Sequence, residues 1–137
     1  MDTSKKFVIE SFMCDKIQQK HKWVSGDFVV EVFMANKRLG YDVIGHIGNQ
    51  WIMGVKDHAP HSHFVVLFRQ DQIQDKFEHQ NIQLIKDFTQ WADSVPEVQG
   101  YSLERLWLNY YMFYKYQLLL HKLWEGKDAI RRVEEKI

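Results

Sequence analysis

Four short runs rich in Val, Ile, Phe and Trp follow one another in the first half of the chain, with turn residues between them. β-Branched and aromatic residues suit the pleated surface of a sheet, so each run predicts a β-strand. The runs are Asp27–Met34, Tyr41–Ile47, Gln50–Val55 and His63–Arg69. A helix over Asp27–Leu39, capped by Ser25 and ended by Gly40, is the alternative to the first strand. We favour the strand and expect a four-stranded antiparallel meander.

Helical patterns lie on both sides of these strands. Apolar residues repeat at helical spacing from Ser4 to His21, and Thr3 or Ser4 could cap that helix. After Gln70 the apolar spacing fits one or two helices that end before Pro96. The sheet is therefore expected to have helices before and after it in the chain.

A long aromatic helix is predicted from Ser102 to Trp124, with Ser102 as its cap and Gly126 as its stop. Its apolar residues spread around every side, which is typical of a buried helix. Polar residues such as Asn109 and Lys115 interrupt it too often for a membrane span. The predicted fold class is α+β, as one domain over residues 1–137. It has an N-terminal helix, a four-stranded antiparallel sheet, and C-terminal helices that include the buried aromatic-rich one.

The turn residues imply a register for the predicted sheet. Gly48-Asn49 is a two-residue hairpin signal, because Gly supplies the positive φ that such a turn needs. In that register Lys56 lies opposite both Tyr41 and His63, on its two neighbouring strands. His46 lies at the other end of the sheet, roughly 17–20 Å away at ~3.3 Å per strand residue. His46 is therefore excluded from any site near His63.

Both faces of the predicted sheet are apolar. The first loop pairs Met34 with Tyr41, and alternation then places Trp51 and Phe64 on one face and Val65 on the other. An antiparallel sheet with one solvent-exposed face would show polar residues at every second position. Each face must therefore be covered by helices, by curling of the sheet, or by a second copy of the chain, and we favour a homodimer.

Three histidines lie within six residues, at His58, His61 and His63. Neutral imidazole is a common ligand for zinc and other divalent metals, and three ligands with one open position is a catalytic arrangement. His61 and His63 would project to one side of an extended segment, and His58 could fold back to join them. The spacing predicts a metal site as one alternative, and with it a metal-dependent enzyme.

The other interpretation of this segment is an exposed turn over Asp57–Ser62, shaped by Pro60, and we favour it. If the segment does form a site, its nearest neighbours in the predicted register are Asp57, Asp42, Tyr41 and Lys56. Tyr41, Lys56 and His63 are accordingly the predicted ligand-binding residues.

Charge and cysteine content restrict the function classes. Lys and Arg total 18 and Asp and Glu total 18, so the chain has no field of one sign to attract nucleic acid or an anionic membrane. A small basic–aromatic cluster, Lys16, Lys20, His21, Lys22 and Trp23, keeps single-stranded nucleic-acid binding as a second alternative. Cys14 is the only cysteine and no signal peptide is apparent, so we expect a cytoplasmic protein.

Aromatic residues make up 15% of the chain, which favours a well-packed core or a self-association surface. Within the chain no Gly-rich phosphate loop or nucleophile motif is present. We therefore expect a small soluble binding or accessory protein, homodimeric and with no chemistry of its own. Its pocket or partner surface would lie between sheet and helices, for a small apolar ligand or another protein.

Overall fold

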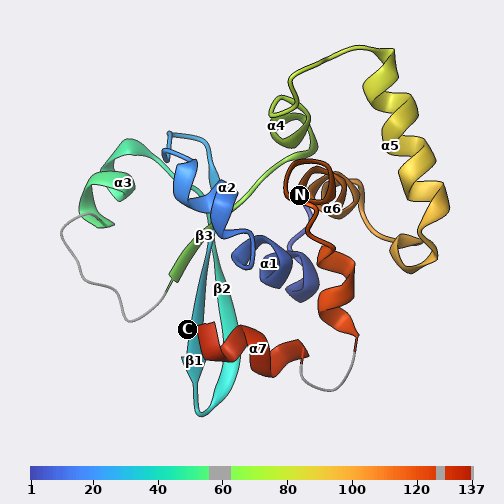
Figure 1. Ribbon diagram of the computed structural model, residues 1–137. Coiled ribbons are helices and arrows are strands. Elements are labelled where there is room, and N and C mark those ends of the chain that lie inside the picture. The colour runs from blue at the N-terminus through green and yellow to red at the C-terminus, as the bar shows by residue number, and fades with distance from the viewer. Residues whose placement is uncertain (56–62, 126–128, 137) are drawn as a thin grey trace. The chain divides into compact units, whose positions relative to one another are not determined.

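The computed structural model describes residues 1–55, 63–125 and 129–136. Helices and an antiparallel sheet are both present, which confirms the α+β class (Figure 1). The chain divides into two compact units. The sheet unit comprises Thr3–Leu67 and Lys127–Ile137, and the helical unit comprises Met1–Asp2 and Phe68–Gly126. None of the helices in the described residues is long and apolar enough to cross a bilayer.

The sheet has three strands rather than the predicted four, in the order β2-β1-β3 and antiparallel throughout. They are β1 (Phe28–Ala35), β2 (Arg38–His46) and β3 (His63–Leu67). Asn36 and Lys37 have φ values of 51° and 63° and join β1 to β2 in a two-residue turn, as a type I′ hairpin requires. That turn pairs Met34 with Leu39, so the predicted pairing of Met34 with Tyr41 was wrong.

The third predicted strand is a helix, α3 (Asn49–Val55), and Gly48-Asn49 is not a hairpin turn. A six-residue run such as Gln50–Val55 is too short for its periodicity to separate a strand from a helix. In the structure β3 pairs directly with β1, so β1 already has a partner on each side. The meander order was therefore wrong. The strand assignment of β1 itself was confirmed against the helical alternative.

The N-terminal segment forms two helices, α1 (Lys5–Phe12) and α2 (Asp15–Lys20), where one was predicted. Ser4 caps α1 as expected, because its hydroxyl oxygen accepts the backbone N–H of Phe7 at 3.3 Å. The break falls at Cys14, whose φ and ψ of −89° and 61° are not helical. Its buried thiol donates to the carbonyl oxygen of Glu10 at 3.1 Å. No Gly or Pro marks this break in the sequence.

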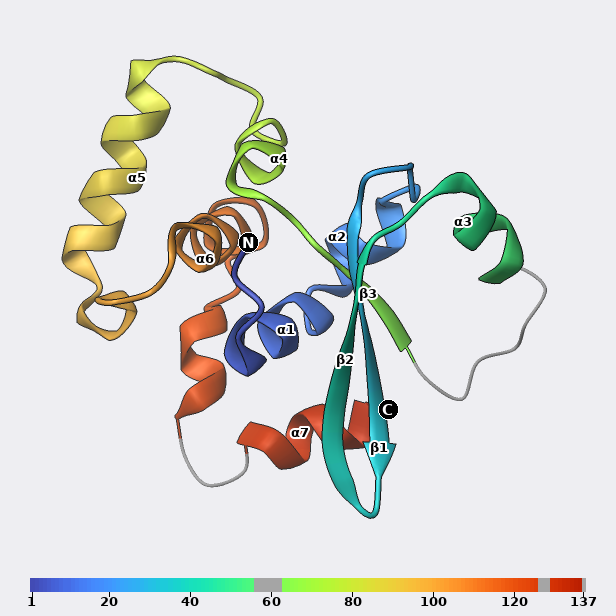
Figure 2. The same cartoon turned by 180° about the vertical axis from the view of Figure 1, so that it is seen from behind.

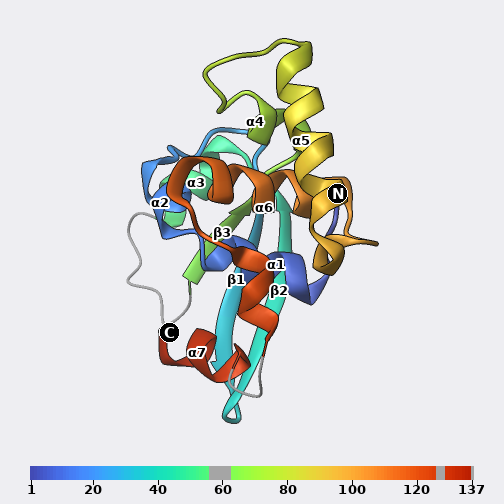
Figure 3. The same ribbon diagram turned by 45° about the vertical axis from the view of Figure 1, so that its right-hand side comes forward.

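Helices lie on both faces of the sheet. α1 packs against β3, and Figures 1 and 2 show α1 and α3 on opposite sides of the strands. α7 (Ala129–Lys136) lies beside the β1–β2 hairpin in these views and in Figure 3, and its Val133 is fully buried. The sheet unit thus includes a helix from the far end of the chain.

The helical unit contains α4 (Gln70–Gln74), α5 (Ile82–Ser94) and α6 (Leu103–Tyr116), with 3₁₀ turns η1 (Pro96–Val98) and η2 (Leu120–Trp124). Aromatic rings from these elements stack around α6; Phe88 and Trp107 are nearly parallel, with ring centres 3.8 Å apart. Ser102 caps α6 as predicted, accepting the N–H of Arg105.

α6 is shorter than the predicted Ser102–Trp124 helix. It ends where Gln117 takes a left-handed conformation with φ of 53°. The N–H of Gln117 then bonds to the carbonyl of Phe113, and that of Leu118 to Met112, which satisfies carbonyls at the helix end. Gly usually occupies this position, so the sequence contained no stop signal before Gly126.

Candidate ligand-binding site

Three aromatic rings from separate parts of the sheet unit meet on one face of the sheet. Trp23 precedes β1, Trp51 lies on α3 and Phe64 lies on β3. The ring centres of Trp51 and Phe64 are 5.2 Å apart at 86°, and those of Trp23 and Trp51 are 5.3 Å apart at 37°. Trp23 also contacts Phe64 edge-on at 6.1 Å. Each such pair contributes roughly 0.5–1.5 kcal/mol beyond its buried area, so this three-ring cluster attaches α3 to the sheet.

Asp27 fixes the loop that carries Trp23 between α2 and β1. Its side chain is 2% exposed, and its Oδ2 accepts the backbone N–H of Val24 at 2.9 Å. The same oxygen lies 2.7 Å from Nε2 of His21, which is the donor because a carboxylate only accepts. The backbone of Asp27 accepts the N–H of Ile47 at 2.9 Å. The His21 ring is thereby held beside the end of the sheet.

A pocket of about 410 Å³ lies next to the three-ring cluster, lined by His21, Lys22, Trp23 and Ile52. Small-molecule sites commonly enclose roughly 300–1,000 Å³, so the pocket has room for one small ligand. The lining combines an indole, an aliphatic side chain, an imidazole and an exposed ammonium group. Such a surface can stack a planar ring and pair with a negative charge.

A smaller hollow of about 190 Å³ lies at the outer edge of β3 and includes His63 and Phe64. Beside it, the side-chain amide of Gln18 forms two hydrogen bonds with the backbone of Val66. Gln18 Nε2 donates to the Val66 carbonyl at 2.8 Å, and its Oε1 accepts the Val66 N–H at 3.0 Å. The amide therefore satisfies the backbone N–H and C=O groups of Val66 at the open edge of the sheet, as a neighbouring strand would.

Two of the predicted ligand-binding residues, Tyr41 and His63, lie in one row across the sheet. Both pair with Val32, on opposite sides of β1, so their side chains share a face roughly 10 Å apart. Val32 takes the middle position that the predicted register gave to Lys56. Each of the two side chains also has its own partner near α1: the Tyr41 hydroxyl donates to the carbonyl of Thr3 before α1, and the His63 ring contacts Phe12 at the end of α1.

The remaining predicted metal and ligand residues, Lys56, His58 and His61, lie outside the described residues. Within the described ranges, no group of three His, Cys, Asp or Glu side chains could hold a metal ion. The metal site with His63 therefore stays a prediction. His46 pairs with Phe28, four residues along β1 from the partner of His63, so these two histidines lie roughly 13 Å apart along the strand direction, although the register from which their separation was predicted was wrong.

His21, Lys22 and Trp23 were predicted only as part of a basic–aromatic cluster, and Asp27, Trp51 and Ile52 were not predicted as site residues. Asp27 had a local signal, because Asp commonly bonds to backbone N–H groups of nearby loop residues. Trp51 and Ile52 had no such local signal. They were predicted to lie on a β-strand, whereas residues 49–55 form the helix α3.

Comparison with known proteins finds no matching family model, no matching curated protein and no matching solved structure. The geometry described above is therefore the basis for assigning a function.

Proposed function

We propose that this chain is a small binding protein that holds a ligand in the pocket lined by His21, Lys22, Trp23 and Ile52. The observation that supports this most directly is the pocket itself, which combines apolar walls with an imidazole and an ammonium group in a volume of about 410 Å³. Binding sites typically have this composition, with a few polar groups fixing the orientation of a ligand in an apolar cleft.

The lining favours a ligand with a planar ring and an anionic group. Trp23 offers a large indole and Ile52 an aliphatic surface, both suited to a flat ring. Lys22 is exposed and supplies a positive charge, and the His21 ring is oriented by the buried Asp27. The Nε2–H of His21 is already donated to Asp27, so the contact with an acidic group on the ligand comes from the Lys22 ammonium group, which donates hydrogen bonds and carries a positive charge.

Adenosine monophosphate is a suitable first probe, because it has one planar ring system and one anionic group. We expect calorimetric titration to show saturable binding with one site per chain, accompanied by a change in tryptophan fluorescence. Lys22→Gln should weaken binding by about tenfold through loss of one ion pair, whereas Lys122→Gln, an exposed lysine in the helical unit, should leave it unchanged.

The phosphate requirement is tested with adenosine, which should bind at least about tenfold more weakly than the monophosphate. Equal loss of binding in the Lys22 and Lys122 variants would point to nonspecific charge attraction and contradict the proposal. So would binding that is unchanged in Trp23→Ala.

Single-stranded nucleic acid is the second candidate ligand, and one observation favours it. Lys16 and Lys20 are exposed on α2, in the same unit as the pocket, so a longer anionic ligand could contact them as well as Lys22. An eight-nucleotide oligodeoxyadenylate would then bind more tightly than the mononucleotide, and its affinity would fall steeply with salt. A salt-independent affinity equal to that of the mononucleotide would limit the ligand to one nucleotide-sized molecule.

A further inference from the structure

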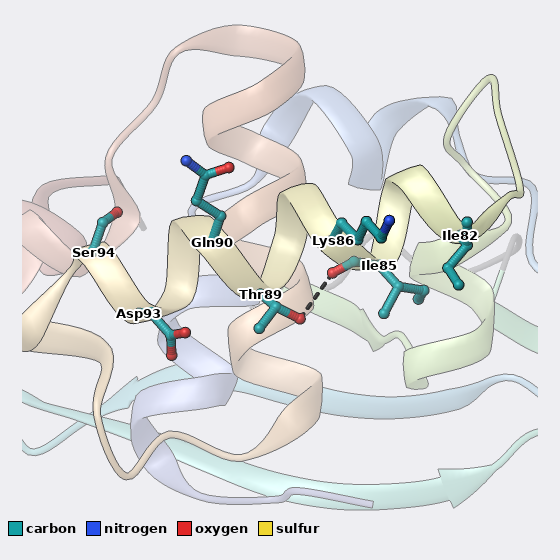
Figure 4. A pocket seen from close by; sticks show the side chains of 7 residues that line it. All are labelled: Ile82, Ile85, Lys86, Thr89, Gln90, Asp93 and Ser94. Carbon is teal, nitrogen blue, oxygen red and sulfur yellow. Dashed lines mark hydrogen bonds between the residues drawn. The ribbon is translucent and has the colours of Figure 1, made fainter.

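The helix α5 has one buried side and one exposed side. Leu84, Phe88 and Trp91 are buried in the helical unit. The opposite side has a shallow groove of about 680 Å³, shown in Figure 4. The groove is lined by Ile82, Ile85, Lys86, Thr89, Gln90, Asp93 and Ser94.

The groove is more apolar than an ordinary solvated helix face. Ile82 is 72% exposed and Ile85 is 44% exposed, one turn apart on the same side. Thr89 continues this stripe, and its hydroxyl donates to the carbonyl of Ile85 at 2.8 Å (Figure 4). Because that hydroxyl is satisfied within its own helix, a covering surface would meet the threonine methyl group without leaving a donor unpaired.

The two charged side chains of the groove are placed symmetrically about Thr89. Lys86 lies three residues before it and Asp93 four residues after it. At 1.5 Å per residue, the two charges are separated by roughly 10 Å along the helix. A second α5, turned end for end about an axis near Thr89, would place its Asp93 beside Lys86 and its Lys86 beside Asp93. The charge pattern of the face is therefore complementary to itself.

We propose that this face of α5 binds a second copy of the chain, in an antiparallel two-fold pair of α5 helices. An isologous contact requires a self-complementary surface, and the order of Lys86, Thr89 and Asp93 provides one. In this register Ile85 would lie opposite Ser94 of the other helix, so the isoleucines at the first turn of each helix cover the last turn of its partner, on both sides of the axis. A single helix pair buries a small area, so the dimer is weak and depends on protein concentration. The proposal is independent of the ligand pocket.

Sedimentation velocity over a range of protein concentrations tests this dimer. From a few micromolar to about 0.5 mM, which covers the dissociation constants expected of a small interface, the wild-type chain should shift from monomer to dimer. Lys86→Glu and Asp93→Lys should each weaken association by about tenfold or more, because each change creates two like-charge contacts by symmetry. The double variant Lys86→Glu/Asp93→Lys restores opposite charges and should dimerise within about threefold of wild type.

A matched control is Lys122→Glu, which makes the same charge change at another exposed lysine of the helical unit. It should leave the dimer unchanged. A wild-type chain that stays monomeric throughout would overturn the proposal. Single variants that associate as well as wild type, or a double variant that fails to recover while its thermal unfolding matches wild type, would also overturn it.

Discussion

Asp27 is the residue on which the geometry of the candidate pocket depends most. Its carboxylate accepts hydrogen bonds from Val24 and His21 while almost fully buried. A loop that carries functional side chains needs such a buried hydrogen-bond acceptor, because it lacks the regular backbone hydrogen bonds of a helix or a strand. The conformation of residues 21–27 therefore depends on this side chain, together with the backbone hydrogen bond from Gly26 N–H to the carbonyl of Ile47.

Replacing Asp27 by Ala should lower the free energy of unfolding by about 2 kcal/mol, because the backbone N–H of Val24 and the ring N–H of His21 lose a buried, charged acceptor. Urea unfolding followed by tryptophan fluorescence measures this loss. Asp42→Ala, which removes an exposed carboxylate from β2, should change stability by less than about 0.5 kcal/mol. Equal effects of the two changes would show that Asp27 does not organise the loop.

For single residues, the sequence predicted correctly those interactions that involve only residues nearby in the chain. The caps at Ser4 and Ser102 were predicted correctly, because a cap depends only on the backbone three residues away. Gln18 could not be anticipated, because its partner Val66 is 48 residues distant in the chain.

Among the elements, β3 is one of the two edge strands of the sheet, and its outer edge is partly covered. A strand at a sheet edge exposes unpaired N–H and C=O groups that can recruit another chain. The Gln18 amide covers those of Val66, and it can do so because an amide presents one donor and one acceptor side by side. The helix α2 is thereby attached to the sheet by a pair of bonds that imitates strand pairing.

Changing Gln18 to Glu should destabilise the sheet unit by roughly 1–3 kcal/mol. The carboxylate keeps the acceptor for the Val66 N–H but replaces the donor with a negative oxygen facing the Val66 carbonyl. Gln19→Glu makes the same change at the next, exposed residue and should be almost neutral. Chemical unfolding measures both, and hydrogen exchange at Val66 should accelerate only in the first variant.

Several secondary-structure elements could not be predicted from sequence patterns alone. The run Gln50–Val55 looked like a strand, yet its Trp51 is held in a helix by Trp23 and Phe64, which are distant in the chain. The breaks at Cys14 and Gln117 occur at residues that seldom end helices. The spacing of apolar residues predicted the class of the fold, whereas strand count and helix ends depended on contacts between distant residues.

At the scale of the whole molecule, the helical unit derives its cohesion from aromatic rings, and this affects its behaviour at high pH. Tyr110 and Tyr111 are 6% and 7% exposed. Burial raises the pKa of Tyr110 above its usual value of 10.0, and the negative charge of Asp87 raises it further. Burial likewise raises the pKa of Tyr111, with a smaller contribution from Tyr116.

Stability should therefore fall in alkaline solution. A raised pKa means that the folded state keeps its protons at a pH where the unfolded chain releases them, so stability is complete below about pH 10 and decreases as the pH rises further. Urea midpoints at about pH 9 and about pH 11 measure the loss, which should be smaller in Tyr110→Phe than in Tyr114→Phe, where the ring is 39% exposed. An identical loss in both variants would contradict this cause.

The sheet unit contains α7, the last of the described elements in the chain, together with the first ones. A ribosome releases α1 first and α7 last, with the elements from α4 to η2 emerging between them. The helical unit is almost continuous in sequence, so nearly all of it is made before α7, whereas the sheet unit is complete only when α7 and its buried Val133 have been made. The unit that begins translation first is therefore completed last, and it is the one that carries the proposed ligand pocket.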